Sequence, residues 1–127
     1  MPLASWDRAL ECTRAALERK AYDLVVLETT KLTSIADYFV ICSGRSDTQV
    51  QAIAEAVRDH LDSLGVQPLS TEGIERGQWA LLDYGDVVVH VFLAETRAFY
   101  DLDRLWADAP SIPLTSEPSA VVAADRP

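Results

Sequence analysis

Apolar residues in this chain fall into short continuous runs that predict β-strands. Leu24–Glu28, of sequence LVVLE, and Tyr38–Ser43, of sequence YFVICS, are rich in aliphatic, aromatic and β-branched side chains, so we expect two buried strands. Val66–Ser70 predicts a shorter strand. Pro68 favours an edge position for it, because proline cannot donate a hydrogen bond to a neighbouring strand.

Two further runs predict a β-hairpin. Gln78–Asp83 and Asp86–Leu93 have the composition of strands, and Tyr84-Gly85 between them is typical of a tight turn. Because strand side chains alternate between faces, one face of this hairpin is expected to join the core. Its members are Ala80, Leu82, Val87, Val89 and Val91.

Elsewhere, apolar residues recur at the spacing of α-helices. Ser5 is placed to cap a first helix. One face of that helix carries Trp6, Ala9, Leu10, Thr13 and Leu17. Ser46 and Gln49 form a capping box that opens a second helix, and Gly65 is placed to end it. The stripe of the second helix consists of Val50, Ile53, Ala54, Val57, Leu61 and Leu64. A last helix is marked by Leu102, Leu105 and Trp106.

The predicted order of elements is α-β-β-α-β-β-β-α, which indicates an α/β fold with a mixed β-sheet and helices packed on it. Residues 1–107 form a single domain in this prediction. Residues 108–127 hold four of the six prolines and show no sustained period, so we expect a flexible C-terminal tail rather than a second domain.

Length and composition agree with one globular domain and exclude some functions. The chain has 127 residues, of which 49% are hydrophobic and 24% charged. No apolar run approaches the roughly 20 residues of a membrane-spanning helix, and no signal peptide is apparent. With only Cys12 and Cys42, the chain is expected in a reducing cytoplasm.

The net charge bears on the class of partner. Eleven Lys and Arg against twenty Asp and Glu give a net charge of −9, which disfavours direct nucleic-acid binding and favours a basic protein partner. The simpler interpretation, that acidity only keeps the protein soluble, stays open.

The other face of the hairpin is the candidate working surface. If the loop is Tyr84-Gly85, three cross-strand pairs share this face: Asp83 with Asp86, Leu81 with Val88, and Trp79 with His90. Opposed carboxylates destabilise a strand pair, so a cation from a partner would offset them, beside an aromatic anchor. The alternative is that Trp79 belongs to the core and the aspartates flank a solvated turn.

Catalytic interpretations find little support. Gly44–Asp47, at a strand-to-helix junction, matches no phosphate-binding motif, and the Asp101–Asp103 pair lies far along the chain from it. The cysteines and histidines lack the spacing of metal ligands, and no nucleophile motif is present. We therefore expect no enzyme activity, no cofactor and no metal.

Three stretches between Ala21 and Trp106 carry recognisable motifs: AYDLVVLETTKLTSIADYFVICSGRSDTQVQAIAEAV, PLSTEG and GQWALLDYGDVVVHVFLAETRAFYDLDRLW. Together they resemble the ribosomal silencing factor (RsfS) family, also called Iojap-like. The match is specific because it joins T-S-I-x-D-Y-F-V-I-C-S-G to W-x-L-L-D-Y-G-D-V-V-V-H-V-F and E-x-R-x-F-Y-x-L-x-x-L-W. The first helix and the tail lie outside these motifs and inherit nothing.

The resemblance implies a nucleotidyltransferase-like fold without the catalytic residues of those enzymes. It implies a cytoplasmic factor that binds the large ribosomal subunit through its universal protein number fourteen. By blocking small-subunit joining, such a factor represses translation when nutrients are scarce. The partner-binding residues it implies are Trp79, Leu81, Asp83, Tyr84, Asp86 and His90. An active nucleotidyltransferase and a homodimeric interaction module remain the alternatives.

Overall fold

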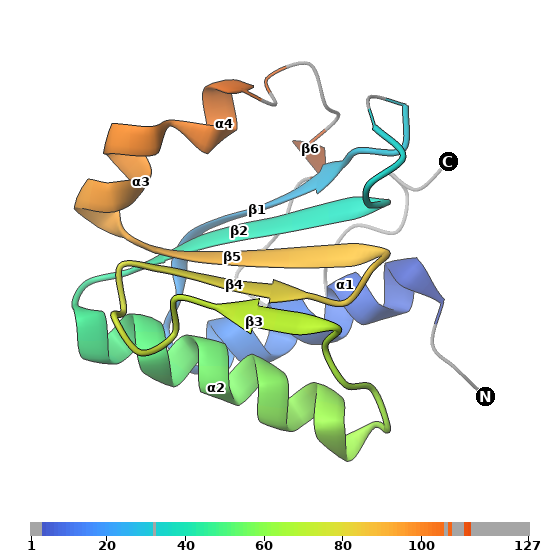
Figure 1. Ribbon diagram of the computed structural model, residues 1–127, viewed down its shortest axis with the longest axis horizontal. Helices are drawn as coiled ribbons and strands as arrows, with labels where there is room; N and C mark the ends of the chain where they lie inside the picture. The colour runs from blue at the N-terminus through green and yellow to red at the C-terminus, as the bar shows by residue number, and fades with distance from the viewer. Residues whose placement is uncertain (1–3, 32, 106, 108–110, 113–127) are drawn as a thin grey trace.

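A six-stranded mixed sheet carries helices on both faces in the computed structural model (Figure 1). The structure describes residues 4–31, 33–105, 107 and 111–112. Its elements are α1 (Ser5–Glu18), β1 (Tyr22–Glu28), β2 (Tyr38–Gly44), α2 (Asp47–Ser63), β3 (Ser70–Glu72), β4 (Trp79–Asp83), β5 (Val87–Leu93), α3 (Ala94–Tyr100), α4 (Leu102–Leu105) and β6 (Ser111–Ile112).

The sheet has the strand order β3-β4-β5-β2-β1-β6. β2 and β5 are parallel, whereas the other neighbours are antiparallel. The predicted α/β class, with its mixed sheet, is therefore confirmed, as is the predicted order of elements, to which the structure adds α3 before the last predicted helix and β6 after it. Helices α1 and α2 lie side by side on one face, and α3 and α4 lie on the other (Figure 1).

The second helix has the ends that the sequence predicts. The Ser46 hydroxyl accepts a hydrogen bond from the Gln49 amide (3.1 Å), while the Gln49 side chain accepts from the Arg45 amide (2.6 Å). At the other end, Gly65 has φ +80°, and the amides of Gly65 and Val66 bond back to the last turn. Five of the six predicted stripe residues are buried, and Leu64 is 44% exposed.

The first helix begins at Ser5, one residue earlier than predicted. Ala4 is the extended residue before α1, and Ser5 already lies inside the helix, so the prediction that Ser5 caps it is wrong. Trp6, Ala9 and Thr13 are buried as expected. Further buried positions on α1 are Cys12, Ala15 and Ala16.

Two other predicted boundaries are wrong. The strand expected over Val66–Ser70 is β3, Ser70–Glu72, because the Val66 amide completes the cap of α2 and its side chain enters the core. β3 is an edge strand, as expected. The last predicted helix is preceded by α3, which was not predicted. Its sequence has no apolar stripe, because no residue of α3 is buried. Of the residues that marked the last helix, Trp106 lies outside the described residues.

The C-terminal segment pairs with the sheet at one point. Ser111 and Ile112 form β6 opposite Leu27 and Val26 of β1, so these two residues of the predicted tail belong to the sheet. Residues 108–110 and 113–127 lie outside the described residues, and the flexible tail stays a prediction there.

The hairpin has a different register from the one predicted. Asp83 pairs with Val88, Leu81 with His90, and Trp79 with Phe92. The Tyr84 amide donates to the Val87 carbonyl (2.9 Å), and Gly85 has φ +90°, so the turn is centred on Gly85 and Asp86. Moving the turn by one residue changes every pair by two residues. Each strand side chain therefore keeps its predicted face, but Asp83 and Asp86 are not opposed.

Candidate protein-interaction face

The sheet face opposite α1 and α2 is apolar and only partly covered. Its buried members are Leu27, Ala36, Phe39, Ile41, Val88, Phe92 and Leu102. α3 and α4 cover one end of it, whereas Trp79 and Leu81 of β4 remain half-buried. We call Trp79, Leu81, Asp83 and His90, together with Tyr100 of α3, the Trp79 face.

Trp79 is held in a fixed orientation by three aromatic neighbours. Its indole N–H donates to Nδ1 of His90 (3.1 Å). Its ring stacks on Phe92, with centroids 4.8 Å apart and planes at 29°, and tilts against Tyr100 at 4.9 Å. A half-exposed tryptophan restrained in this way loses little side-chain entropy on binding, which suits an interface anchor.

His90 is buried and neutral. The residue is only 5% exposed, and burial lowers its pKa to about 4, although the Asp83 carboxylate partly opposes that shift. Because Nδ1 accepts the Trp79 hydrogen bond, the proton of the neutral ring lies on Nε2. This Nε2 is buried and has no hydrogen-bond partner among the described residues. His90 therefore orients Trp79 from beneath, as a support rather than a surface group.

Asp83 contributes the negative charge of the face. One carboxylate oxygen accepts the amide hydrogen of Gly85 (2.8 Å), which fixes the side chain next to the turn. The carboxylate remains partly exposed. The face thus combines an aromatic anchor, an aliphatic neighbour in Leu81 and one carboxylate.

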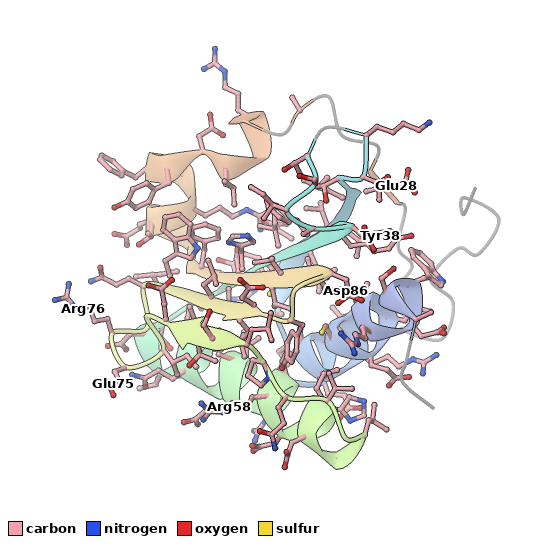
Figure 2. All side chains as sticks on the ribbon, turned by 45° about the vertical axis from the view of Figure 1, so that its right-hand side comes forward. Glu28, Tyr38, Arg58, Glu75, Arg76 and Asp86 are labelled. Carbon is pink, nitrogen blue, oxygen red and sulfur yellow. The ribbon has the colours of Figure 1, made fainter. Side chains whose placement is uncertain are left out.

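Tyr84 and Asp86 do not lie on this face. The expectation that Asp86 stands on it opposite Asp83 is therefore wrong, whereas Tyr84 was expected at the site only from the family resemblance. Tyr84 is 4% exposed and belongs to the core beneath α1 and α2, where burial raises the pKa of its phenol. Asp86 lies at the end of the sheet next to α1 (Figure 2) and forms an ion pair with Arg8 (3.0 Å). Its carbonyl accepts the amides of Asp37 and Tyr38. Both residues therefore help to hold the end of the sheet together.

The Arg8–Asp86 pair predicts a measurable coupling. Both side chains are about three-quarters buried, so Asp86→Asn is expected to lower the free energy of unfolding by about 1 kcal/mol, as is Arg8→Ala. The double variant should lose less than the sum of the two, because the interaction is lost only once. Denaturant unfolding of the four proteins measures this. A coupling free energy of zero would mean that the pair contributes nothing.

The structure adds two aromatic residues that the sequence reasoning missed. Phe99 is 81% exposed and Tyr100 is 55% exposed, and both lie at the end of α3, where the Tyr100 ring packs against Trp79 and the Phe99 ring against Tyr100. The sequence signal for them is the adjacent Phe-Tyr pair of the E-x-R-x-F-Y motif, two aromatic residues in an otherwise polar segment. These rings extend the apolar surface around Trp79.

The residues weighed as metal ligands or catalytic groups lie apart from one another or have local structural roles. Among them, no three His, Cys, Asp or Glu side chains gather as metal ligands. Cys12 and Cys42 are buried free thiols, and burial raises the pKa of both. Asp47, at the start of α2, accepts the amide hydrogen of Thr48 and so acts in the local turn. In the part of the chain that the structure describes, no helix is long and apolar enough to cross a membrane.

Comparison with known proteins is consistent across sequence and structure. A model of the family described as "Ribosomal silencing factor during starvation" matches residues 2–127. The ribosomal silencing factor RsfS of Bacillus subtilis is 46% identical over 93 residues, covering 73% of this chain and 79% of that protein. A mouse protein, mitochondrial assembly of ribosomal large subunit protein 1, is 32% identical over 70% of this chain and 40% of its own length.

A solved structure has the same fold. The crystal structure of a Chromobacterium violaceum protein matches with a TM-score of 0.81 and 36% identity, covering 90% of this chain and 96% of that chain. The family match spans nearly the whole chain, and the relatives cover most of the sheet and its helices. The chain therefore belongs to the ribosomal silencing factor family.

Proposed function

We propose that this protein binds the large ribosomal subunit through its universal protein number fourteen and thereby blocks joining of the small subunit. Trp79 is the apolar anchor in this proposal, Leu81 packs beside it, and Asp83 accepts hydrogen bonds from basic side chains. His90 holds Trp79 in place. The protein acts in the cytoplasm by steric occlusion, without catalysis, cofactor or metal.

The observation that carries the proposal is the geometry of Trp79 in a member of this family. The side chain is held by His90, Phe92 and Tyr100, yet remains partly exposed. A surface tryptophan with fixed aromatic neighbours is the kind of residue on which binding energy concentrates. The net charge of −9 supports the same proposal, because ribosomal proteins are basic and opposite charge speeds association.

Asp83 permits a test of the electrostatic part of the proposal. Asp83→Asn keeps an oxygen that can accept the Gly85 amide hydrogen but removes the charge. We expect association with isolated ribosomal protein fourteen to slow by about two- to fivefold at low salt, and the difference to shrink at high salt. The measurement is surface-immobilised binding kinetics at two ionic strengths.

The matched control for that experiment is Asp7→Asn, which removes the same charge from an exposed site on α1. It should change the association rate less than Asp83→Asn does. If the two variants behave alike, Asp83 contributes only to the overall charge and its placement on the interface is wrong.

A further inference from the structure

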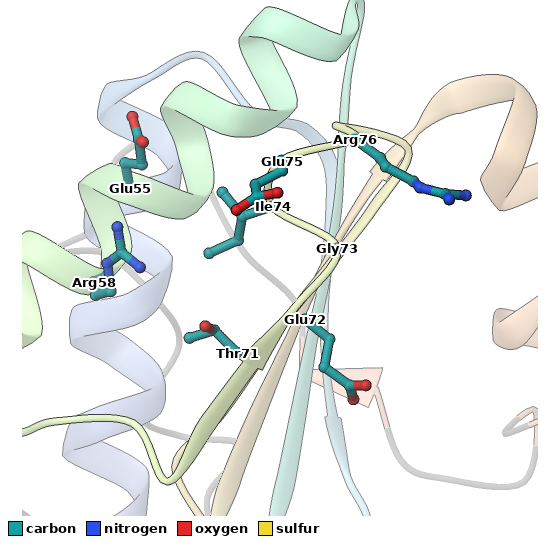
Figure 3. A pocket seen from close by; sticks show the side chains of 8 residues that line it. All are labelled: Glu55, Arg58, Thr71, Glu72, Gly73, Ile74, Glu75 and Arg76. Carbon is teal, nitrogen blue, oxygen red and sulfur yellow. The ribbon is translucent and has the colours of Figure 1, made fainter.

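The outer edge of β3 borders a groove that the proposed function does not use. The groove lies between β3, the loop that follows it and α2 (Figure 3). Two adjoining hollows of about 450 Å³ and 320 Å³ share Arg58 and Thr71, so they form one channel along the strand. All three residues of β3 are exposed. Within the described residues, β4 is the only strand that pairs with β3.

The walls of this groove are fixed. Thr71 lies on the β3 side, across from Arg58 and Glu55 of α2 (Figure 3). The loop after β3 is tied to α2 by a hydrogen bond from the Gln51 side chain to the Glu75 carbonyl (2.6 Å). Gly73 has φ +75°, and a side chain there would collide with the Trp79 carbonyl. The loop is therefore packed closely against β4, and the groove keeps its width.

The groove has the charge to select its occupant. Four acidic side chains and one basic side chain line the two hollows, an excess of three negative charges: Glu55, Asp59, Asp62 and Glu75, with Arg58. The side chains of Glu72 and Arg76, at the rim, point away from the groove (Figure 3). An exposed strand edge offers unpaired backbone groups to an added strand, and negative walls favour positive side chains on that strand.

We propose that this groove binds an extended, positively charged segment of another protein, which adds to the sheet as a strand beside β3. A second copy of this chain is a poorer occupant, because two such grooves would bring like charges together. The chain's own C-terminal segment is poorer too, because β6 joins the opposite edge of the sheet and the residues after it carry no net positive charge. The interaction is separate from the proposed binding through the Trp79 face.

The test uses an acetylated and amidated seven-residue peptide in which lysine alternates with threonine or valine. In nuclear magnetic resonance titrations we expect amide shifts in Ser70–Glu72 and along the facing side of α2. Hydrogen exchange of the β3 amides or their neighbours should slow in the complex. The double variant Asp59→Lys, Glu75→Lys should lower the affinity for the peptide by about tenfold at low salt, and by less at high salt.

Two controls decide between strand addition and general attraction. The control double variant Asp7→Lys, Glu18→Lys makes the same charge change at exposed sites on α1. It should lower the affinity for the peptide much less. The same peptide with all of its backbone amides N-methylated keeps its charge but has no amide hydrogen to donate on either edge. It should not bind. Equal binding of the methylated peptide, equal weakening in the α1 control, or shifts confined to the Trp79 face would each overturn the proposal. So would protection, in the free protein, of those β3 amides that point away from β4.

Discussion

Trp79→Ala is expected to weaken binding to the large ribosomal subunit by about thirtyfold or more. Loss of an anchor side chain at an interface centre costs about 2 kcal/mol or more, and that free energy corresponds to this factor. The variant should still fold, because Trp79 is only half-buried and the buried core beneath α1 and α2 does not include it. Sedimentation with isolated large subunits measures the affinity, and circular dichroism checks the fold.

The control for this variant must separate lost binding from lost stability. Trp79 contacts Phe92 and Tyr100, so its removal also destabilises the protein. Val57→Ala is a suitable match because Val57 is fully buried on the far side of the sheet, where truncation costs about 2 kcal/mol. The Val57 variant should bind normally. If it loses as much affinity as Trp79→Ala, or if Trp79→Ala unfolds the protein, Trp79 is a core residue and not an anchor.

The second large effect is a loss of stability in mild acid. The folded protein has a His90 pKa of about 4, against an ordinary value of 6.5, because burial disfavours the charged ring. Between those pH values the unfolded chain binds a proton that the folded chain does not. The free energy of unfolding therefore falls as the pH decreases from 6.5 to 4, by about 3 kcal/mol in total from this residue.

His90→Gln isolates that contribution, since glutamine does not titrate and its oxygen can accept the Trp79 hydrogen bond. Carboxylates titrate in the same range, so the informative quantity is the difference between wild type and variant. The wild type should lose more stability than the variant as the pH falls from 6.5 to 4, in urea unfolding at a series of pH values. His60→Gln, which alters a half-exposed histidine on α2, is the control. Parallel pH profiles for wild type and His90→Gln would contradict the account of a buried neutral His90.

Much of the fold follows from local sequence signals. The second helix was predictable at both ends, because Ser46, Gln49 and Gly65 each satisfy a backbone requirement that few other residues can meet. Likewise, alternation in the hairpin strands placed Leu82 and Val89 on the core side and Trp79 and Leu81 on the other. These features depend on residues close together in sequence.

Features that depend on distant contacts could not be predicted in the same way. Gly85 can be either the first or the second of the two central residues of the hairpin turn, because glycine suits both positions. The sequence therefore does not determine where the turn lies. Asp86 meets a cation on α1, seventy-eight residues away, which no local pattern encodes. α3 escaped prediction because no residue of it is buried.

The candidate site shows the same division. Trp79, Leu81, Asp83 and His90 could be grouped from alternation alone, whatever the register. Asp86 was placed opposite Asp83 because the turn was predicted one residue early, whereas Tyr84 was implied by the family resemblance alone. Phe99 and Tyr100 were missed since their closeness to Trp79 arises only when α3 folds back over the sheet.

The central claim is that the Trp79 face attaches this protein to the large subunit and so keeps the small subunit away. The most direct measurement is a subunit-joining experiment on sucrose gradients, with purified subunits and increasing amounts of wild type, Trp79→Ala or Val57→Ala. The account predicts that wild type and Val57→Ala migrate with free large subunits and reduce the joined ribosomes, whereas Trp79→Ala needs about thirtyfold more protein for the same effect. Joined ribosomes that form undiminished while wild-type protein is bound to the large subunit would contradict it.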